Sequence, residues 1–165
     1  MLAAILWVAA SALAAPRTAG PLRGGDGFHV SMPAADEEVF RWDAGLPWNP
    51  TESDIRLESV DLINVRGLEV LGIVLSYPTQ ANGVCVSAGD DKGFPPAGKI
   101  TDRIEGVVLP RAADRTCTNY PTIVVGLRLL ASTPKGEIEA VRVRYEYVGV
   151  VYELVLPSSV DLHRP

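Results

Sequence analysis

The residues best suited to covalent chemistry are two cysteines, Cys85 and Cys117, and the chain has no others. They lie at either end of a stretch rich in glycine and proline. A cysteine pair in an exported protein usually forms a disulfide, and closing a loop of about 30 residues would stabilise the fold by roughly 3–4 kcal/mol. Neither cysteine belongs to a Cys-x-x-Cys motif or has a histidine nearby in sequence, which argues against a metal ligand or a redox thiol. We therefore predict a disulfide between Cys85 and Cys117.

Only two histidines are present, His29 near the start of the chain and His163 at its end. A Ser-His-Asp or Cys-His site would therefore have to be assembled from the two ends of the chain. A metal site based on histidine is disfavoured for the same reason. We expect no catalytic activity, no cofactor and no metal.

Two acidic pairs are further candidate sites. Asp90 and Asp91 have the oxygen ligands that calcium prefers, but they lack the alternating spacing of a calcium loop, so a turn is the simpler interpretation. Asp102 and Glu105 have the residue types of a glycoside hydrolase pair, although two neighbouring acids in a loop are commonplace. We expect neither pair to form a site.

Four aromatic residues are candidates for contacting a partner or a carbohydrate. They are Trp42, Trp48, Phe94 and Tyr120. An exposed, coplanar arrangement of these rings would favour sugar binding. The alternative is that the tryptophans hold a linker against the folded domain, and their burial would weaken the carbohydrate hypothesis.

The overall charge limits the partners of this chain. Its 165 residues suggest one domain, and 20 acidic against 15 basic residues give a net charge of −5. A nucleic-acid-binding domain normally carries a basic stripe, so we expect no nucleic-acid partner.

The first 50 residues predict export. Residues 2–15 are apolar apart from Ser11, and their length suits the hydrophobic region of a signal peptide, with Ala12-Leu13-Ala14 as a cleavage pattern. A truncated membrane anchor and a buried helix of the domain remain as alternatives. Residues 16–50 are crowded with glycine and proline and predict an extracytoplasmic linker. We expect the chain to be secreted or anchored to the membrane through residues 1–15.

The pattern changes to β-strands for the predicted domain, residues 51–165. Short runs rich in β-branched and aromatic residues are separated by turn signals, and Gly67 suits a hairpin turn between the first two runs. About seven strands of this spacing predict an all-β fold, a two-sheet sandwich of immunoglobulin-like size. Gly72 and Gly126 lie in mid-strand, which indicates a bulge or the close approach of another group. The expected strands are 55–63, 68–77, 122–131, 138–147 and 150–156, with weaker candidates at 83–87 and 104–109.

The last two strands define a hairpin whose register can be predicted. If Val148 and Gly149 form the loop, Tyr145 faces Tyr152 on one side of the sheet, while Arg144 faces Glu153 on the other. A shift of one residue would mix the apolar and polar faces. Val148 is unfavourable in a type I′ turn, which requires a positive φ there. We expect the tyrosines to belong to the core.

Residues 121–157, with "VVGLRLLA" followed by this hairpin, resemble the end of small uncharacterised exported domains of GC-rich Gram-positive bacteria. Those domains are membrane-tethered immunoglobulin-like modules, so the resemblance implies location and fold but transfers no site residues. It suggests a non-catalytic interaction module of the cell envelope. Such a module would bind an envelope or secretion protein through loops or a sheet edge. A carbohydrate-binding sandwich is the alternative.

Overall fold

The structure is a computed structural model, and it describes residues 15–35, 37–45, 47–81, 84–86 and 93–165, without the side chains of residues 81 and 84–86. The strands are β1 (His29–Pro33), β2 (Phe40–Gly45), β3 (Ile55–Ile63), β4 (Leu68–Ser76), β5 (Thr79–Ala81), β6 (Val84–Val86), β7 (Ile100–Thr101), β8 (Val108–Leu109), β9 (Thr122–Leu129), β10 (Lys135–Ile138), β11 (Ala140–Tyr147), β12 (Val150–Leu156) and β13 (Ser159–His163). Two short 3₁₀ helices, η1 (Ala112–Asp114) and η2 (Cys117–Asn119), precede β9.

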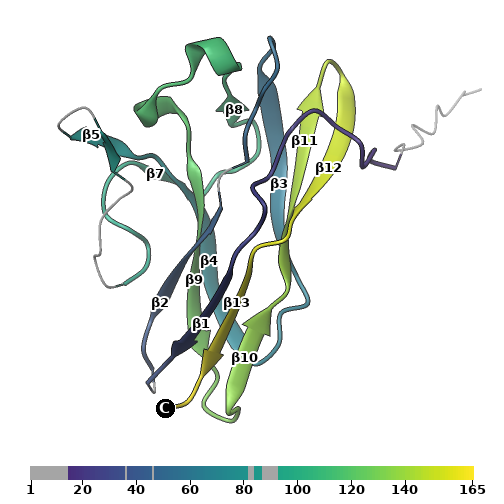
Figure 1. Ribbon diagram of the computed structural model, residues 1–165. Helices are drawn as coiled ribbons and strands as arrows, with labels where there is room; N and C mark the ends of the chain where they lie inside the picture. Colours follow the sequence, from purple (N-terminus) through teal and green to yellow (C-terminus); the bar gives the residue numbers. More distant parts are fainter. Residues whose placement is uncertain (1–14, 36, 46, 82–83, 87–92) are drawn as a thin grey trace, which may run out of the picture.

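The strands form a β-sandwich, as Figure 1 shows. One four-stranded sheet has the order β12-β11-β3-β8, and the other has the order β2-β9-β4-β7. A third sheet, β1-β13-β10, lies at the end of the molecule that carries the C-terminus, and β5 pairs with β6. The prediction of an all-β sandwich is confirmed at this level, and the described residues contain no α-helix.

A single apolar core joins these sheets because strand residues alternate between the two faces of a sheet. In β11, Val141, Val143 and Tyr145 are fully buried, whereas Arg142 and Arg144 between them point outward. The facing sheet contributes buried side chains from β4 and β9 to the same core cluster. The pattern of alternate burial therefore sets which face of each strand meets the other sheet.

The predicted hairpin register is confirmed. Tyr145 pairs with Tyr152 and Arg144 pairs with Glu153 across β11 and β12. The two tyrosine rings stack with their centroids 5.7 Å apart, and Tyr145 is fully buried. Both loop residues have positive φ, 51° at Val148 and 71° at Gly149, as a type I′ turn requires.

The hairpin predicted around Gly67 is wrong, because β3 and β4 belong to different sheets. Gly67 has a φ of 62°, but it lies in a connection that crosses from one layer to the other. Another turn, at residues 130–133, precedes β10. The Thr133 amide donates to the Leu130 carbonyl, and Lys135 already begins β10. Turn residues indicate where the chain bends, but they do not determine which strand the following strand pairs with.

The expected linker, residues 16–50, contains two strands of the sandwich, so it is not a separate linker. β1 pairs in parallel with β13, and β2 pairs with β9. Before β1, residues 17–24 form what we call the N-terminal strap, which runs along β12. The Arg17 amide donates to the Val151 carbonyl, the Glu153 amide donates to the Arg17 carbonyl, and Leu22 is buried. A glycine-rich segment lacks the alternation of apolar residues that predicts a strand, yet its main chain can still pair with an open strand edge.

No helix in the described residues is long and apolar enough to span a bilayer. The predicted signal peptide or anchor, residues 1–15, lies outside the described residues except for its last residue.

Candidate functional site

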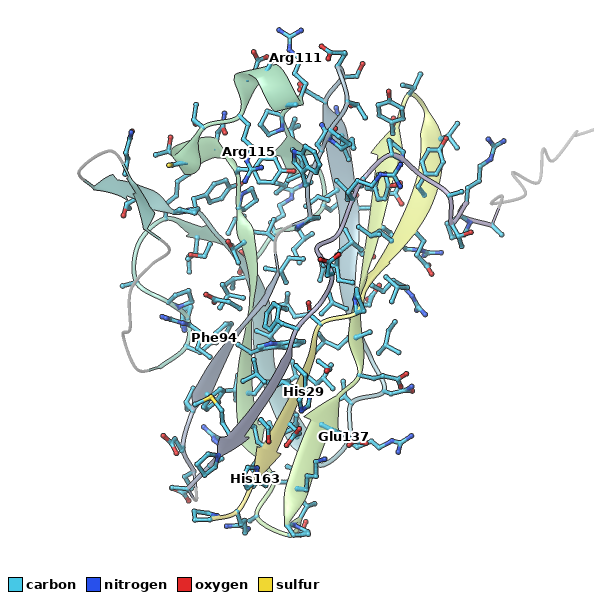
Figure 2. The ribbon with its side chains drawn as sticks, viewed as in Figure 1. His29, Phe94, Arg111, Arg115, Glu137 and His163 are labelled. Carbon is cyan, nitrogen blue, oxygen red and sulfur yellow. The ribbon has the colours of Figure 1, made fainter. Side chains whose placement is uncertain are left out.

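The four predicted aromatic contacts do not form one surface. Trp42 and Tyr120 are each only 2% exposed and belong to the core, whereas Trp48 is 46% exposed. The Tyr120 hydroxyl accepts a hydrogen bond from the Asn49 amide, and the guanidinium of Arg115 lies 4.3 Å from the Tyr120 ring centre. Figure 2 shows Arg115 near the 3₁₀ helices, far from Phe94. The arrangement gives carbohydrate no shared platform of exposed rings.

Phe94 explains the two mid-strand glycines. Gly72 follows a bulge in β4 and pairs with Gly126 of β9. A Cβ atom at Gly126 would lie 2.3 Å from the Phe94 ring, and one at Gly72 would lie 3.1 Å from it. Both of the expected causes, a bulge and a close approach, therefore occur together, and Phe94 serves packing here.

The cysteines lie in neighbouring parts of the fold. Cys117 is in η2 and has no free thiol. Cys85 is in β6, and its backbone faces Gln80 of β5, the strand that contacts η2. Because the side chain of Cys85 lies outside the described ones, its bond to Cys117 stays a prediction.

Of the two acidic pairs, Asp102 and Glu105 are exposed. Asp90 and Asp91 lie outside the described residues.

An apolar cleft opens between β1 and β2, which are edge strands of two different sheets. Its volume is about 510 Å³. Two of its apolar side chains are notably exposed, Phe28 at 43% and Met32 at 38%. Charged residues, among them Glu38 and Arg41, line it as well. The apolar lining consists of Phe28, Val30 and Met32 on one side and Val39, Phe40 and Trp42 on the other.

Two residues that line this cleft, Trp42 and Asp43, carry polar groups affected by burial. Among the described residues nothing accepts a hydrogen bond from the buried indole Nε1 of Trp42. Burial raises the pKa of the Asp43 carboxyl, and the charge of Arg41 lowers it only in part. A buried donor without an acceptor is uncommon and destabilising.

A polar cluster covers the outer face of the β1-β13-β10 sheet. We define it as His29 and Ser31 of β1 with Ser159, Asp161 and His163 of β13. The Nε2 atom of His29 lies 2.7 Å from Oδ1 of Asp161, and its Nδ1 atom lies 2.9 Å from Oγ of Ser159. Ser31 donates a hydrogen bond of 2.7 Å to Oδ2 of Asp161, and Nδ1 of His163 lies 3.7 Å from that oxygen. Asp161 is therefore the centre of the cluster.

The charge state of Asp161 follows from these neighbours. Burial alone would raise the pKa of its carboxyl, but the hydrogen bond from Ser31, the positive charge of Lys135, and the charges of His29 and His163 when these are protonated outweigh that effect and lower the pKa. The Asp161 side chain is 11% exposed, against 59% for His29. The cluster thus holds a shielded carboxylate beneath an accessible imidazole.

A hollow of about 300 Å³ lies beside the cluster, and His29, Ser159 and Asp161 line it together with Lys135 and Arg66. Glu137, which lies 3.5 Å from Arg66 and 3.7 Å from Lys135, also lines it. Figure 2 shows His29, Glu137 and His163 at the same end of the molecule. In the part of the chain that the structure describes, no three His, Cys, Asp or Glu side chains are arranged to hold a metal ion.

The sequence did not predict this cluster, because its two histidines lie near opposite ends of the chain. A signal was present in the alternation. His29 and Ser31 are two residues apart, as are Ser159, Asp161 and His163. Val160 and Leu162, between them, are buried. Alternation of this kind is typical of a strand with one apolar and one polar face.

No protein-family model, curated protein or solved structure matches this chain. The features that bear on its function are the cleft, the polar cluster and the composition of the chain.

Proposed function

We propose that this chain is an interaction module that works outside the cytoplasmic membrane of a bacterial cell. In this proposal it binds an extended segment of a partner protein, by strand addition at the cleft between β1 and β2. The observation that carries the proposal is that β1 and β2 share one apolar cleft and that, among the described strands, each is the outermost strand of its sheet. Strand addition to an exposed edge is a recurrent way for a protein to bind a peptide.

The chemistry of the cleft favours such a partner. Phe28, Val30 and Met32 alternate with polar residues and line the cleft from one side, so a bound strand with apolar residues at every second position would cover them. An apolar centre with charged residues around it, such as Glu38, is the usual anatomy of a protein interface.

Location outside the membrane rests on residues 2–15, whose length and composition suit a signal peptide or anchor. Fusion of residues 1–50 to a reporter that is active only outside the cytoplasm tests it. We expect reporter activity, and a stable but silent fusion would contradict this location.

Selection from a displayed library of random nine-residue peptides tests strand addition. We expect the enriched peptides to alternate apolar and polar residues and to protect amides of β1 and β2 from hydrogen exchange. The variant Phe28→Lys/Met32→Lys should lose these peptides, because both side chains line the cleft and are exposed in the free protein.

Val155→Lys is the matched control, since Val155 is 46% exposed on β12 and does not line the cleft. It should bind the selected peptides as the wild type does. Enriched peptides without alternation, or protection of amides elsewhere in the sandwich, would contradict strand addition at this cleft.

A further inference from the structure

The polar cluster lies on the face of β1 opposite to the cleft, so it is independent of the proposed interaction. His29 and Ser31 alternate along β1 with the cleft residues Val30 and Met32. The expectation of no catalytic activity rested on the two histidines lying in the ends of the chain. The structure removes that reason, because His29 meets Ser159 from 130 positions away.

We propose that Ser159, His29 and Asp161 form a hydrolytic site in which Ser159 is the nucleophile. The geometry has the three relations that such a site requires. The nucleophile and the base are in hydrogen-bond contact, with 2.9 Å between Oγ of Ser159 and Nδ1 of His29. The base is oriented by a carboxylate, with 2.7 Å between Nε2 of His29 and Oδ1 of Asp161. A hollow that can admit a substrate is lined by all three residues.

The hydrogen bonds assign the roles of the two imidazole nitrogens. An ionised carboxylate only accepts hydrogen bonds, so Asp161 holds the proton of His29 on Nε2. The Nδ1 lone pair then faces the Ser159 hydroxyl and can take its proton. Ser31 donates to the second oxygen of Asp161, and we assign it as a positioning residue because it acts through that carboxylate. The low pKa of Asp161 keeps the carboxylate charged while it does so.

The reaction follows from these positions. The Ser159 proton moves to Nδ1 of His29 as Oγ forms a bond to the ester carbonyl carbon. The carbon–oxygen bond to the leaving alcohol then breaks, and that alcohol takes the proton from Nδ1. Water, deprotonated by the same nitrogen, attacks the acyl-serine, releases the carboxylic acid and restores Ser159. Lys135 and Arg66 line the hollow, each also close to Glu137, and their positive charges can stabilise the negative oxygen of the tetrahedral intermediates.

The size of the hollow limits the substrate class. A volume of about 300 Å³ is at the lower end of the range for ligand pockets, which is roughly 300–1,000 Å³. A short acyl ester fits this volume better than a long lipid chain. p-Nitrophenyl acetate is therefore the probe for turnover, and an alkyl fluorophosphonate is the probe for the nucleophile.

The full chain should hydrolyse p-nitrophenyl acetate above the rate of buffer alone, and the fluorophosphonate should label Ser159 in peptide mapping. Ser159→Ala should abolish the label and lower kcat/KM by about 100-fold or more, whereas Ser132→Ala, at an exposed turn serine, should leave both unchanged. His29→Ala should lose activity that added imidazole restores, which a purely structural role would not produce. The same imidazole should not rescue Ser159→Ala.

Three results would overturn the proposal. They are hydrolysis no faster than in buffer, turnover that survives Ser159→Ala, and acylation found on Lys135 instead of Ser159. Urea titration of each variant separates lost chemistry from lost folding. The peptide selection at the cleft does not involve these side chains, so its result is independent of this one.

Discussion

Val148 shows how a single residue can oppose the turn that contains it. Its φ of 51° lies in the left-handed region, where a β-branched residue is strained. The left-handed conformation costs an ordinary residue roughly 1–2 kcal/mol, and asparagine tolerates it better. The side chain of Val148 is 75% exposed, so little packing would be lost if it were replaced.

Val148→Asn should therefore raise the free energy of unfolding by about 1 kcal/mol, measured by urea titration. Val155→Asn is the matched control. Val155 is a partly exposed residue of regular β12, where valine favours the strand, so its replacement should leave stability unchanged or lower it. A fall in stability for Val148→Asn would contradict the assigned strain.

Two aspartates should give the protein opposite pH dependences. The pKa of Asp161 is below its ordinary value of 3.8, so its contribution to stability is present above that value and is lost as the pH falls through the lower pKa. The pKa of Asp43 is above 3.8 because of burial, so the contribution of Asp43 is present below that value and is lost as the pH rises through the higher pKa.

Asp161→Asn should therefore lower stability at pH 7, and its difference from the wild type should shrink at acid pH. Asp43→Asn should raise stability at pH 7, and this gain should disappear below about pH 3.8. Urea titrations of both variants between about pH 2.5 and pH 7 check these signs, a range that spans the ordinary carboxyl pKa values. If the stability change of both variants depended on pH in the same way, the opposite pKa shifts of Asp161 and Asp43 would be contradicted.

At the scale of elements, the N-terminal strap depends on close contact with the β11–β12 hairpin. The Leu22 amide donates to the hydroxyl of Tyr145. A Cβ atom at Gly20 would lie 2.0 Å from that hydroxyl and 2.8 Å from the ring of Tyr152. Gly25, a few residues along the same segment, has nothing within 4 Å of such an atom.

Gly20→Ala should consequently lower the free energy of unfolding by about 1–3 kcal/mol, the usual penalty for overpacking. Gly25→Ala should change stability little or raise it by up to about 1 kcal/mol, because alanine restricts the unfolded chain. Thermal or urea unfolding of both variants makes the comparison. Equal effects at the two glycines would mean that the strap does not rest on the tyrosines.

At the scale of the whole molecule, the predicted disulfide would join the β5–β6 hairpin to the 3₁₀ helices before β9. Intact-mass measurement before and after reduction and alkylation should show one bond between Cys85 and Cys117. Reduction should then lower the free energy of unfolding by roughly 3–4 kcal/mol, as for a closed loop of about 30 residues. Two free thiols in the non-reduced protein would exclude the bond.

The sequence by itself determined the local elements of this protein. Strands β3 and β12 have the bounds that their patterns predict, and the register of Tyr145 with Tyr152 follows from the alternation and the short loop between them. These features depend on residues within about 20 positions in sequence, and over that distance alternating apolar residues and turn residues predict the structure. The all-β class follows from the same local signals.

Only the tertiary structure decided which strands share a sheet. The strands flanking Gly67 are β3 and β4, yet they belong to opposite layers. Likewise, nothing local indicated that β1 would pair with β13 or that β2 would pair with β9. A strand pairs with a sheet edge that is left open once the core is formed. The residues of that strand alone do not determine which edge this is.

Of all the features of the fold, the candidate sites depend most on this long-range pairing. His29 and Ser159 are ordinary polar residues in sequence, and the parallel pairing of β1 with β13 places them side by side. The cleft exists because β1 and β2 end up as edges of different sheets. The sequence therefore specified which side chains are available, whereas the order of strands in the sheets decided which of them meet. The physical reason is that main-chain pairing joins segments far apart in the chain through groups that every residue carries.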